Sequence, residues 1–338
     1  MSSAINWSEK VVMITGGTGS FGRKFAALLM DEYRPKKLII FSRDELKQHD
    51  MRVAGFDFPN LRYFIGDVRD KERLYRAFSG VDIVVHAAAL KQIPAAEYNP
   101  FEVIKTNVLG AANVVDAAID AGVEKVIALS TDKAANPINL YGATKLCSDK
   151  LFVAGNAYSA AKPTRFSVVR YGNVLGSRGS AVPSFLAERK NGSISITDPR
   201  MTRFWITLEQ GIRFVIACLE RMHGGETFVP KLPSMKVVDL AEAVAPGCRI
   251  KIIGIRPGEK LHEVMIPADV SRHAIEFEDS YVIQPHFHWW NGDHCKGGRP
   301  CEEGFQYSSE TNDRWLTIQE MVAMVGGLRR EAYEAVAS

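Results

Sequence analysis

The sequence has 338 residues, of which 46% are hydrophobic and 24% are charged, and its formal net charge is +3. These values are ordinary for a folded globular protein, and the charge is too small to indicate a nucleic-acid or membrane-surface partner. The N-terminal residues have no secretory signal pattern, no apolar run approaches the roughly 20 residues of a membrane span, and the five scattered cysteines do not indicate a disulfide framework. We therefore expect a cytoplasmic protein of two lobes with a large buried core.

The first half of the chain alternates short apolar runs with stretches of helical spacing. This alternation is typical of a parallel sheet that helices cover on both faces. We predict a Rossmann-type, doubly wound α/β domain over 1–172, with a return segment near 205–225. The predicted strands are 10–15, 37–42, 61–65, 81–86, 125–130 and 165–171, and the predicted helices are 21–33, 71–78, 100–121 and 141–158.

From about residue 173 the alternation stops, and short strands, glycines and prolines become frequent. We expect 173–338 to form a smaller C-terminal α/β lobe for the substrate, with a strand at 193–199 and helices over 208–222 and 236–244. The segment 285–313 is rich in polar residues and glycine, which predicts an irregular loop. Its histidines and cysteines lack the spacing of a zinc site, so we expect no metal there. These residues are His286, His288, His294, Cys295 and Cys301.

A glycine-rich segment, Thr-Gly-Gly-Thr-Gly-Ser-Phe-Gly, joins the first predicted strand to the first predicted helix. Glycines permit a tight turn and a close approach of the backbone to a pyrophosphate, and a helix N-terminus supplies free N–H groups. The position between a strand and a helix favours a dinucleotide site over an ordinary turn. The residues assigned to this site are Gly16, Thr18, Gly19, Ser20, Phe21 and Gly22.

The end of the second predicted strand indicates which dinucleotide binds. Arg43 and Lys47 can pair with a 2′-phosphate and Ser42 can donate to it, so NADP is favoured, although Asp44 keeps NAD possible. The ends of the later strands complete the site, because ligands of such sheets bind at the carboxyl ends of the strands. These residues are Asp67, Val68, Ala87, Ala88 and Ala89, with Val174 farther along the chain.

Two acid–base pairs follow the fifth predicted strand. Tyr141 and Lys145 are four residues apart, so they share one helix face, and the ammonium should lower the pKa of the phenol. Asp132 and Lys133 form the second pair, directly after Thr131. An alcohol oxidation needs only the first pair, so the second indicates chemistry beyond one hydride transfer. Taken alone, Asp132 could equally be a turn residue and Lys133 a solvated amine. Thr131 could be a buried strand residue.

These motifs together resemble the extended short-chain dehydrogenase/reductase family. Its nucleotide-sugar 4,6-dehydratases carry Thr-Asp-Glu after the fifth strand, whereas this chain has Thr-Asp-Lys at 131–133. With the segments Asp-Pro-Arg-Met-Thr-Arg-Phe-Trp-Ile-Thr and Gly-Ile-Arg-Pro-Gly-Glu-Lys-Leu-His-Glu, this departure closely resembles the inverting UDP-N-acetylglucosamine 4,6-dehydratases of pseudaminic acid biosynthesis. The resemblance extends from about residue 10 to about residue 284 and is poor over 285–306.

The resemblance implies a redox-neutral dehydration of UDP-N-acetylglucosamine with a tightly bound NADP. Tyr141, supported by Lys145, would take the C4 hydroxyl proton while hydride leaves C4, and Thr131 would bond the C4 oxygen. Lys133 would remove the C5 proton if its pKa is pulled down by burial or a neighbouring cation, and Asp132 would protonate the leaving C6 hydroxyl. Hydride would return to C6 with inversion at C5, giving UDP-2-acetamido-2,6-dideoxy-β-L-arabino-hexos-4-ulose.

The resemblance also implies a set of residues that bind the UDP-sugar. Arg256 suits a diphosphate, Glu259 could accept from the uridine ribose, and Lys91 is a candidate neighbour of the second lysine. The family usually pairs through two long helices, here 100–121 and 141–158, so we expect a homo-oligomer. The full set of predicted substrate residues is Lys91, Asn173, Arg178, Thr197, Met201, Arg203, Arg256 and Glu259.

Three alternatives remain open from the sequence. A UDP-sugar 4-epimerase needs the tyrosine and lysine but has no need of an Asp–Lys pair. These motifs distinguish a retaining 4,6-dehydratase only poorly from an inverting one. An NADP-sensing binding protein without catalytic activity would have no need of Tyr141 and Lys145 at this spacing.

Overall fold

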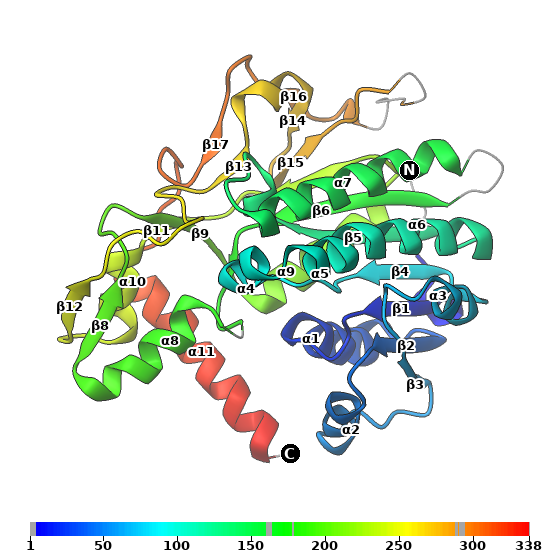
Figure 1. Cartoon of the computed structure of the whole chain (residues 1–338), viewed down its shortest axis with the longest axis horizontal. Coiled ribbons are helices and arrows are strands. Elements are labelled where there is room, and N and C mark those ends of the chain that lie inside the picture. The colour runs from blue at the N-terminus through cyan, green and yellow to red at the C-terminus, as the bar shows by residue number, and fades with distance from the viewer. Residues whose placement is uncertain (1–4, 160–163, 178, 288–289, 291–294, 338) are drawn as a thin grey trace.

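A ten-stranded sheet forms the centre of the computed structural model, which describes residues 5–159, 164–177, 179–287, 290 and 295–337 (Figure 1). Its strand order is β16-β14-β15-β10-β6-β5-β4-β1-β2-β3. The strands from β10 to β3 in this order run parallel, and the other three are antiparallel. The predicted doubly wound α/β fold is therefore confirmed. The strands are β1 Val11–Thr15, β2 Lys37–Ser42, β3 Leu61–Ile65, β4 Ile83–His86, β5 Lys125–Thr131, β6 Arg165–Tyr171, β10 Thr227–Pro230, β14 Ala274–Glu276, β15 Ser280–Ile283 and β16 Arg299–Pro300.

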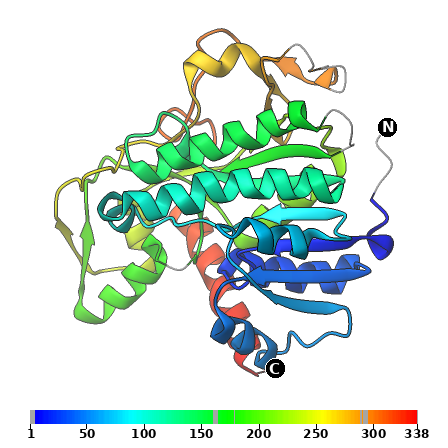
Figure 2. The same ribbon diagram turned by 45° about the vertical axis from the view of Figure 1, so that its right-hand side comes forward.

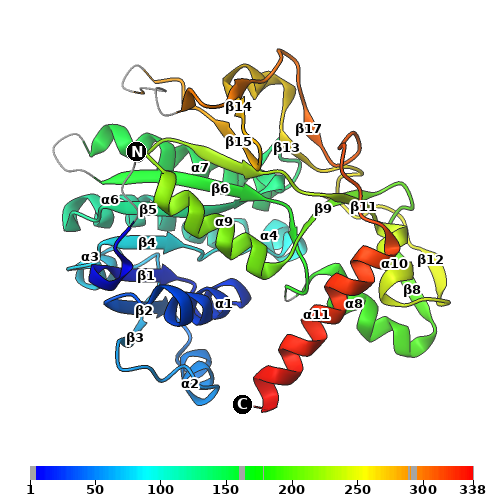
Figure 3. The ribbon, with the colours of Figure 1, turned by 180° about the vertical axis from the view of Figure 1, so that it is seen from behind.

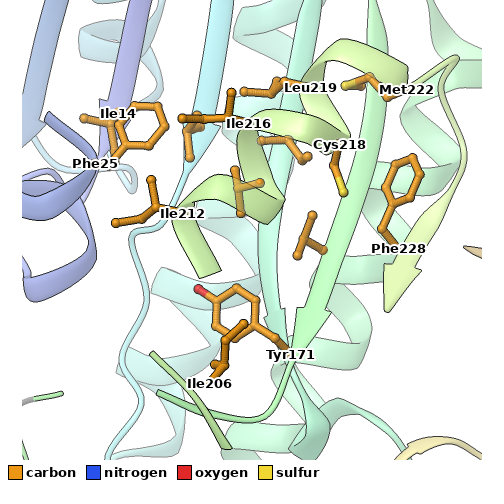
Figure 4. Close-up of a cluster of buried hydrophobic side chains, with 14 of the residues drawn as sticks. Ile14, Phe25, Tyr171, Ile206, Ile212, Ile216, Cys218, Leu219, Met222 and Phe228 are labelled. Atoms are coloured by element: carbon orange, nitrogen blue, oxygen red, sulfur yellow. The ribbon is translucent and has the colours of Figure 1, made fainter. Parts of the chain in front are cut away.

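Helices cover both faces of this sheet, which explains why its central strands are continuous apolar runs. Helices α3 (Lys71–Phe78), α6 (Gly110–Ala121) and α7 (Leu140–Tyr158) pack on one face, and α1 (Ser20–Leu28) and α9 (Leu208–Arg221) pack on the other (Figures 1 and 3). On the second face, Ile212 and Ile216 of α9 lie in one buried cluster with Ile14 and Phe25 (Figure 4). This packing fixes the carboxyl ends of the strands relative to one another.

Several helices differ from the sequence prediction. The predicted helix 100–121 consists of α5 (Pro100–Ile104), a π-helical segment Lys105–Leu109 and α6. The predicted helix 21–33 consists of α1 and a π-helical segment Leu29–Tyr33. Four α-helices in the described residues were not predicted. They are α2 Glu45–Val53, α4 Ile93–Tyr98, α8 Ala181–Glu188 and α11 Ile318–Ala337.

A smaller lobe lies beside the carboxyl ends of the parallel strands (Figures 1 and 2). It contains α8, α10 (Val237–Val244), α11 and a parallel pair of strands, β8 (Ser193–Ile196) and β12 (Arg249–Ile252). Ile194, Leu240 and Met321 contribute to its separate hydrophobic core. A second small sheet, with the order β11-β9-β7, leads into this lobe. Its strands are β7 Asn173–Val174, β9 Thr202–Ile206 and β11 Ser234–Lys236.

The second half of the chain also extends the main sheet. Strands β10, β14, β15 and β16 all come from this half, and the predicted irregular loop 285–313 contains β16 and β17 (Tyr307–Ser308). Strand β17 pairs with β13 (Val264–Ile266), and the Tyr307 ring packs on Phe204 at 4.7 Å between ring centroids. The prediction of an irregular loop is therefore wrong for the two short strands β16 and β17. No helix in the described part of the chain is long and apolar enough to cross a membrane.

Candidate active site

One cavity of about 780 Å³ lies where the predicted sites meet, at the carboxyl ends of the parallel strands. Its walls come from the segments that follow β1, β2, β3, β4, β5 and β6, together with the start of α7 and the loop around Arg256. All the residues predicted to bind the cofactor line this cavity, as do the five residues predicted to carry the chemistry. The strand-end rule therefore located one contiguous site.

The glycine-rich loop needs its glycines for steric reasons. Gly16 has a φ of +68°, and a Cβ atom there would lie 2.9 Å from the backbone nitrogen of Ala88. A Cβ atom on Gly22 would collide with the carbonyl oxygen of Gly17. The bare backbone thus lets β1, the loop and α1 approach one another, and it leaves a concave surface beside the start of α1 that fits the pyrophosphate of a dinucleotide.

The segment after β2 carries charges of both signs. The Asp44 carboxylate caps α2 by accepting from the Lys47 backbone nitrogen at 3.0 Å, and it pairs with Lys47 Nζ at 2.7 Å. These hydrogen bonds lower the pKa of Asp44. Arg43 lies 3.8 Å from Asp67, whose carboxylate also pairs with Arg69 at 2.8 Å. The acidic residue that kept NAD possible is therefore engaged as a helix cap.

The glycine at the start of α7 brings the two acid–base pairs together. Strand β5 ends at Thr131, and a single 3₁₀ turn, Asp132–Ala134, follows it. Asn139 caps α7 by accepting from the backbone nitrogen of Gly142 at 2.8 Å. A Cβ atom on Gly142 would collide with the carbonyl oxygen of Lys133, so only glycine allows this helix start to lie against the 3₁₀ turn.

Two carboxylates surround the Lys133 ammonium. Its Nζ donates to Asp132 Oδ1 at 3.1 Å and forms an ion pair with Glu263 Oε1 at 3.2 Å. Burial lowers the pKa of Lys133, but the two carboxylates outweigh burial and raise this pKa above its ordinary value. A lowered pKa, the condition set for Lys133 to act as a base, is therefore not met in this arrangement, because a second carboxylate, Glu263, lies beside the ammonium. Lys91 lines the cavity, and burial lowers its own pKa.

The phenol of Tyr141 lies in the cavity beside the Asp132–Lys133 pair. Burial raises the pKa of Tyr141 to about 12, while the Lys133 ammonium and a hydrogen bond with Thr131 act in the opposite direction. Burial lowers the pKa of Lys145, which Asp149 partly offsets. The expected lowering of the phenol pKa by Lys145 is therefore not found: the pKa is raised, and the cation that acts on the phenol is Lys133.

The structure brings half of the predicted substrate residues into the cavity. Lys91, Asn173, Arg256 and Glu259 line it, and Arg256 lies 3.9 Å from Glu259. Asn139 donates to the carbonyl oxygen of Gly258 at 2.8 Å, which ties the loop 256–259 to the start of α7. Arg178 lies outside the described residues.

Three predicted substrate residues, Thr197, Met201 and Arg203, do not line this cavity, so their role in substrate binding stays a prediction. The Arg203 guanidinium is buried and donates to the carbonyl oxygens of Thr202, Lys260 and Leu261 at 2.7 to 2.9 Å. Thr197 donates to Met201 Sδ at 3.0 Å. Arg203 thus satisfies backbone carbonyls of its own lobe, a role that the arginine's place in the motif did not reveal.

Sequence reasoning also missed residues of the site. Glu263 and Lys260 lie behind Lys133, and the only signal for them was their place in the segment that contains Arg256 and Glu259. No group of three or more His, Cys, Asp and Glu side chains in the described ranges could hold a metal ion, and His288 and His294 lie outside those ranges. Further cavity-lining residues without a sequence signal are Gln92, Ile93, Pro94, Thr106, Tyr171, Ser177, Ser180, Leu208 and Pro257.

Comparison with known proteins gives relatives over nearly the whole chain. The model of the polysaccharide biosynthesis protein family matches residues 12–285. The inverting UDP-N-acetylglucosamine 4,6-dehydratase of Campylobacter jejuni is 55% identical over 328 residues, which cover 94% of this chain and 98% of the relative. The UDP-glucose 4-epimerase of Rickettsia massiliae is 44% identical over 283 residues, covering 81% and 83%. The solved structure of Pen from Bacillus thuringiensis is 34% identical, covers 96% of this chain and 99% of its own, and superimposes with a TM-score of 0.88.

Proposed function

The chain belongs to the polysaccharide biosynthesis protein family, and on that premise we propose that it is an inverting UDP-N-acetylglucosamine 4,6-dehydratase. Its predicted membership of the extended short-chain dehydrogenase/reductase family is confirmed. The observation that carries the proposal is the presence of Asp132 and Lys133 in the same cavity as Tyr141 and Lys145. The 55% identity to a dehydratase of this name supports it.

The first pair performs the oxidation at C4. Tyr141 takes the C4 hydroxyl proton and Thr131 bonds the same oxygen, and the buried Lys145 would hold the nicotinamide ribose when the cofactor binds. When bound, NADP⁺ would accept a hydride from C4 and return it to C6, and its positive charge would favour the ionised phenol. The new C4 carbonyl makes the C5 proton acidic, which prepares the elimination.

The second pair performs the elimination across C5 and C6. Lys133 Nζ donates to Asp132 Oδ1 at 3.1 Å, so one proton moving along this bond turns an ammonium and a carboxylate into a neutral amine and a carboxylic acid. The amine then removes the C5 proton, and the acid protonates the departing C6 hydroxyl. A single proton transfer thus prepares the base and the acid together. Reprotonation of C5 from the opposite face completes the inversion.

Membership of the family indicates a nicotinamide dinucleotide as the cofactor. We propose that its form here is NADP. Asp44 is engaged as the cap of α2 and with Lys47 Nζ, which disfavours its binding to a ribose 2′-hydroxyl. The Arg43 side chain is 54% exposed and lies beside the cavity entrance, where it can pair with a 2′-phosphate. These contacts favour the phosphorylated cofactor.

We also propose a homo-oligomer that forms through the helices on the α7 face of the sheet. Tyr98, Phe101 and Leu109 are 87%, 76% and 53% exposed, and they follow one another along α4, α5 and the π-helical segment. Large exposed apolar side chains grouped in this way are typical of protein interfaces. Sedimentation analysis of the wild type and of Phe101→Glu would test this assembly.

The function is tested by incubating the holoenzyme with UDP-N-acetylglucosamine in D₂O and following the sugar by NMR. An inverting dehydratase loses the C6 hydroxyl, incorporates deuterium at C5 and inverts C5. A retaining dehydratase gives the same exchange with C5 retained. The second candidate is a 4-epimerase, which the 44% identity to the Rickettsia enzyme favours, and it would change C4 with no exchange at C5. Either of these last two results would replace the proposed function.

A further inference from the structure

Glu263 is a buried carboxylate that neither acid–base pair contains. Its side chain is 3% exposed, and it is not one of the described residues that line the cavity. Three cations face it: Lys133 Nζ at 3.2 Å, Lys260 Nζ at 3.8 Å and Arg203 Nε at 3.9 Å. Its Oε2 atom has no hydrogen-bond partner in the part of the chain that the structure describes. A buried charge is costly unless it is paired, so its closest partner defines its role.

That closest partner is Lys133, because the other two cations are used elsewhere. The Arg203 guanidinium donates to three backbone carbonyl oxygens, and Lys260 Nζ donates to the carbonyl oxygen of Ala135 at 2.7 Å. Both lie beyond hydrogen-bonding distance of the Glu263 carboxylate. In the described part of the chain, Lys133 Nζ contacts two carboxylates: it donates to Asp132 Oδ1 and forms an ion pair with Glu263 Oε1.

The backbone of Glu263 is held independently of the lysine. Its N–H donates to Ser309 Oγ at 2.9 Å, and the backbone nitrogen of Ser309 donates back to its carbonyl oxygen at 2.8 Å. Ser309 Oγ also lies 2.8 Å from Thr202 Oγ1. These bonds join segments around 202, 263 and 309, so the small sheets of the substrate side fix the carboxylate. It is therefore a rigid anchor for a flexible four-carbon side chain.

We propose that Glu263 is the positioning residue of Lys133: it holds Nζ towards the substrate and stabilises the ammonium that forms when this nitrogen takes the C5 proton. This inference rests on the proposed function. In the step, the C5–H bond breaks, an Nζ–H bond forms, and the electron pair moves onto the C4 carbonyl as an enolate. Glu263 remains an anion throughout, so it acts through Lys133 and does not touch the sugar.

The proposal gives a reason for the second carboxylate. A carboxylate 3.2 Å away stabilises the ammonium more than the amine, so it makes the neutral amine a stronger base. The charged or titratable groups that face Lys133 are Asp132, Glu263, Arg203, Lys260 and Tyr141. Of these, Asp132 exchanges a proton with the lysine in the proposed reaction, and the cations Arg203 and Lys260 oppose the ammonium. Glu263 is the permanent negative charge.

The test compares Glu263→Gln with the wild type, both as holoenzymes with UDP-N-acetylglucosamine in D₂O. We expect the absorbance of the reduced nicotinamide to appear on mixing, because Tyr141 and Lys145, which carry out the C4 oxidation in the proposed mechanism, are unchanged in this variant. We expect deuterium incorporation at C5 and formation of the keto sugar to fall about 100-fold, the size of a typical acid–base contribution. The descending limb of the pH–rate profile should move to lower pH, since the Asp132–Lys133 pair loses its shared proton more readily without the nearby negative charge.

A loss of stability alone would lower the rate but would not move this limb of the pH–rate profile. The position of the limb therefore distinguishes a structural role of Glu263 from a positioning role. Glu310→Gln is the matched control, because Glu310 is an acid of the same lobe that is 59% exposed and pairs with His262. It should behave like the wild type. C5 exchange within threefold of the wild type in Glu263→Gln, or an unmoved limb, would overturn the proposal.

Glu263→Asp keeps the test decisive if the glutamine variant does not fold. The shorter acid retains the charge, so its pH limb should stay close to that of the wild type while its C5 exchange slows, because Nζ is no longer held at the right distance. A limb displaced to lower pH in Glu263→Asp would contradict the proposal. Failure of the proposed function has another signature: wild-type enzyme that shows no C5 exchange with this sugar nucleotide at all.

Discussion

The cofactor half of the cavity is assembled from the ends of successive parallel strands, whereas the substrate half collects side chains from segments far apart in the chain. In the cofactor half, residues that line the cavity come directly after the last residue of each strand from β1 to β5. In the substrate half, Asn173 comes from strand β7 and Arg256 from a separate loop, and Glu263 reaches Lys133 across 130 positions of sequence.

This difference shows which constraint acts on each half. Parallel strands in one sheet must end at the same edge, so any polar or glycine residue that follows them meets its counterparts there. No comparable rule brings Thr202, Glu263 and Ser309 together; their contact depends on hydrogen bonds between short strands. A substitution in the cofactor half should therefore act through steric fit, and one in the substrate half through charge and placement.

The largest expected effect belongs to Lys133, where the two halves meet. Replacing it in Lys133→Met removes the base but leaves the glycine-rich loop untouched. We expect keto-sugar formation to fall about 1,000-fold while the cofactor stays bound. NMR of the product and the cofactor content of the purified protein check this result. Lys105→Met, which changes an exposed lysine paired with Glu102, should match the wild type. Unchanged turnover in Lys133→Met would remove this lysine from the mechanism.

In the cofactor half, Gly22→Ala tests steric fit. The added Cβ atom would collide with the carbonyl oxygen of Gly17, so α1 must shift away from the loop. Overpacking of this kind costs about 1–3 kcal/mol, and we expect a similar loss of unfolding free energy and about a 30-fold weaker binding of NADP. Denaturant unfolding and cofactor titration measure the two quantities. In the control Gly326→Ala, within α11, nothing lies within 4 Å of the new atom, so binding should not change. Equal binding by both variants would refute the steric argument.

The same contrast explains what the sequence could predict. The central strands of the sheet are buried on both faces and therefore stand out as apolar runs, and the glycine-rich loop carries its chemistry in consecutive residues. Helix α2 was missed because it buries only Gln48 and Met51 and has no apolar stripe. Strands β10, β14 and β15 have three or four residues each, too few for a recognisable period.

The sequence predicted those parts of the site whose residues are close together in the chain, and it missed contacts between distant residues. Tyr141 and Lys145 are one helical turn apart, and that spacing alone places them together. The direction of the pKa shift of Lys133 could not be predicted, because it depends on Glu263, which no spacing connects to it. Arg203 was assigned to the substrate for its type and motif, but buried carbonyl oxygens engage its guanidinium.

A smaller effect is expected at the rim of the cofactor half. Arg43→Ala removes a guanidinium that can pair with the 2′-phosphate, so NADP should bind about 10-fold more weakly while NAD binding stays the same. Titration of both cofactors measures the ratio. Arg52→Ala is the control, because this arginine lies at the other end of α2 and near Asp57. An equal loss for NAD and NADP would place Arg43 outside the phosphate site.

The smallest expected effect lies in the substrate half. Thr197 was predicted to bind the sugar nucleotide, but its hydroxyl donates to Met201 Sδ, a weak acceptor, and the residue does not line the cavity. Thr197→Val has nearly the same shape, so the KM for UDP-N-acetylglucosamine should change less than about twofold, whereas Arg256→Ala should raise it about 10-fold. Steady-state kinetics of the two variants compare a residue inside the cavity with one outside it. A tenfold rise in KM for Thr197→Val would mean that the substrate half rearranges on binding, because only a movement of the segment 197–203 could bring this hydroxyl to the ligand.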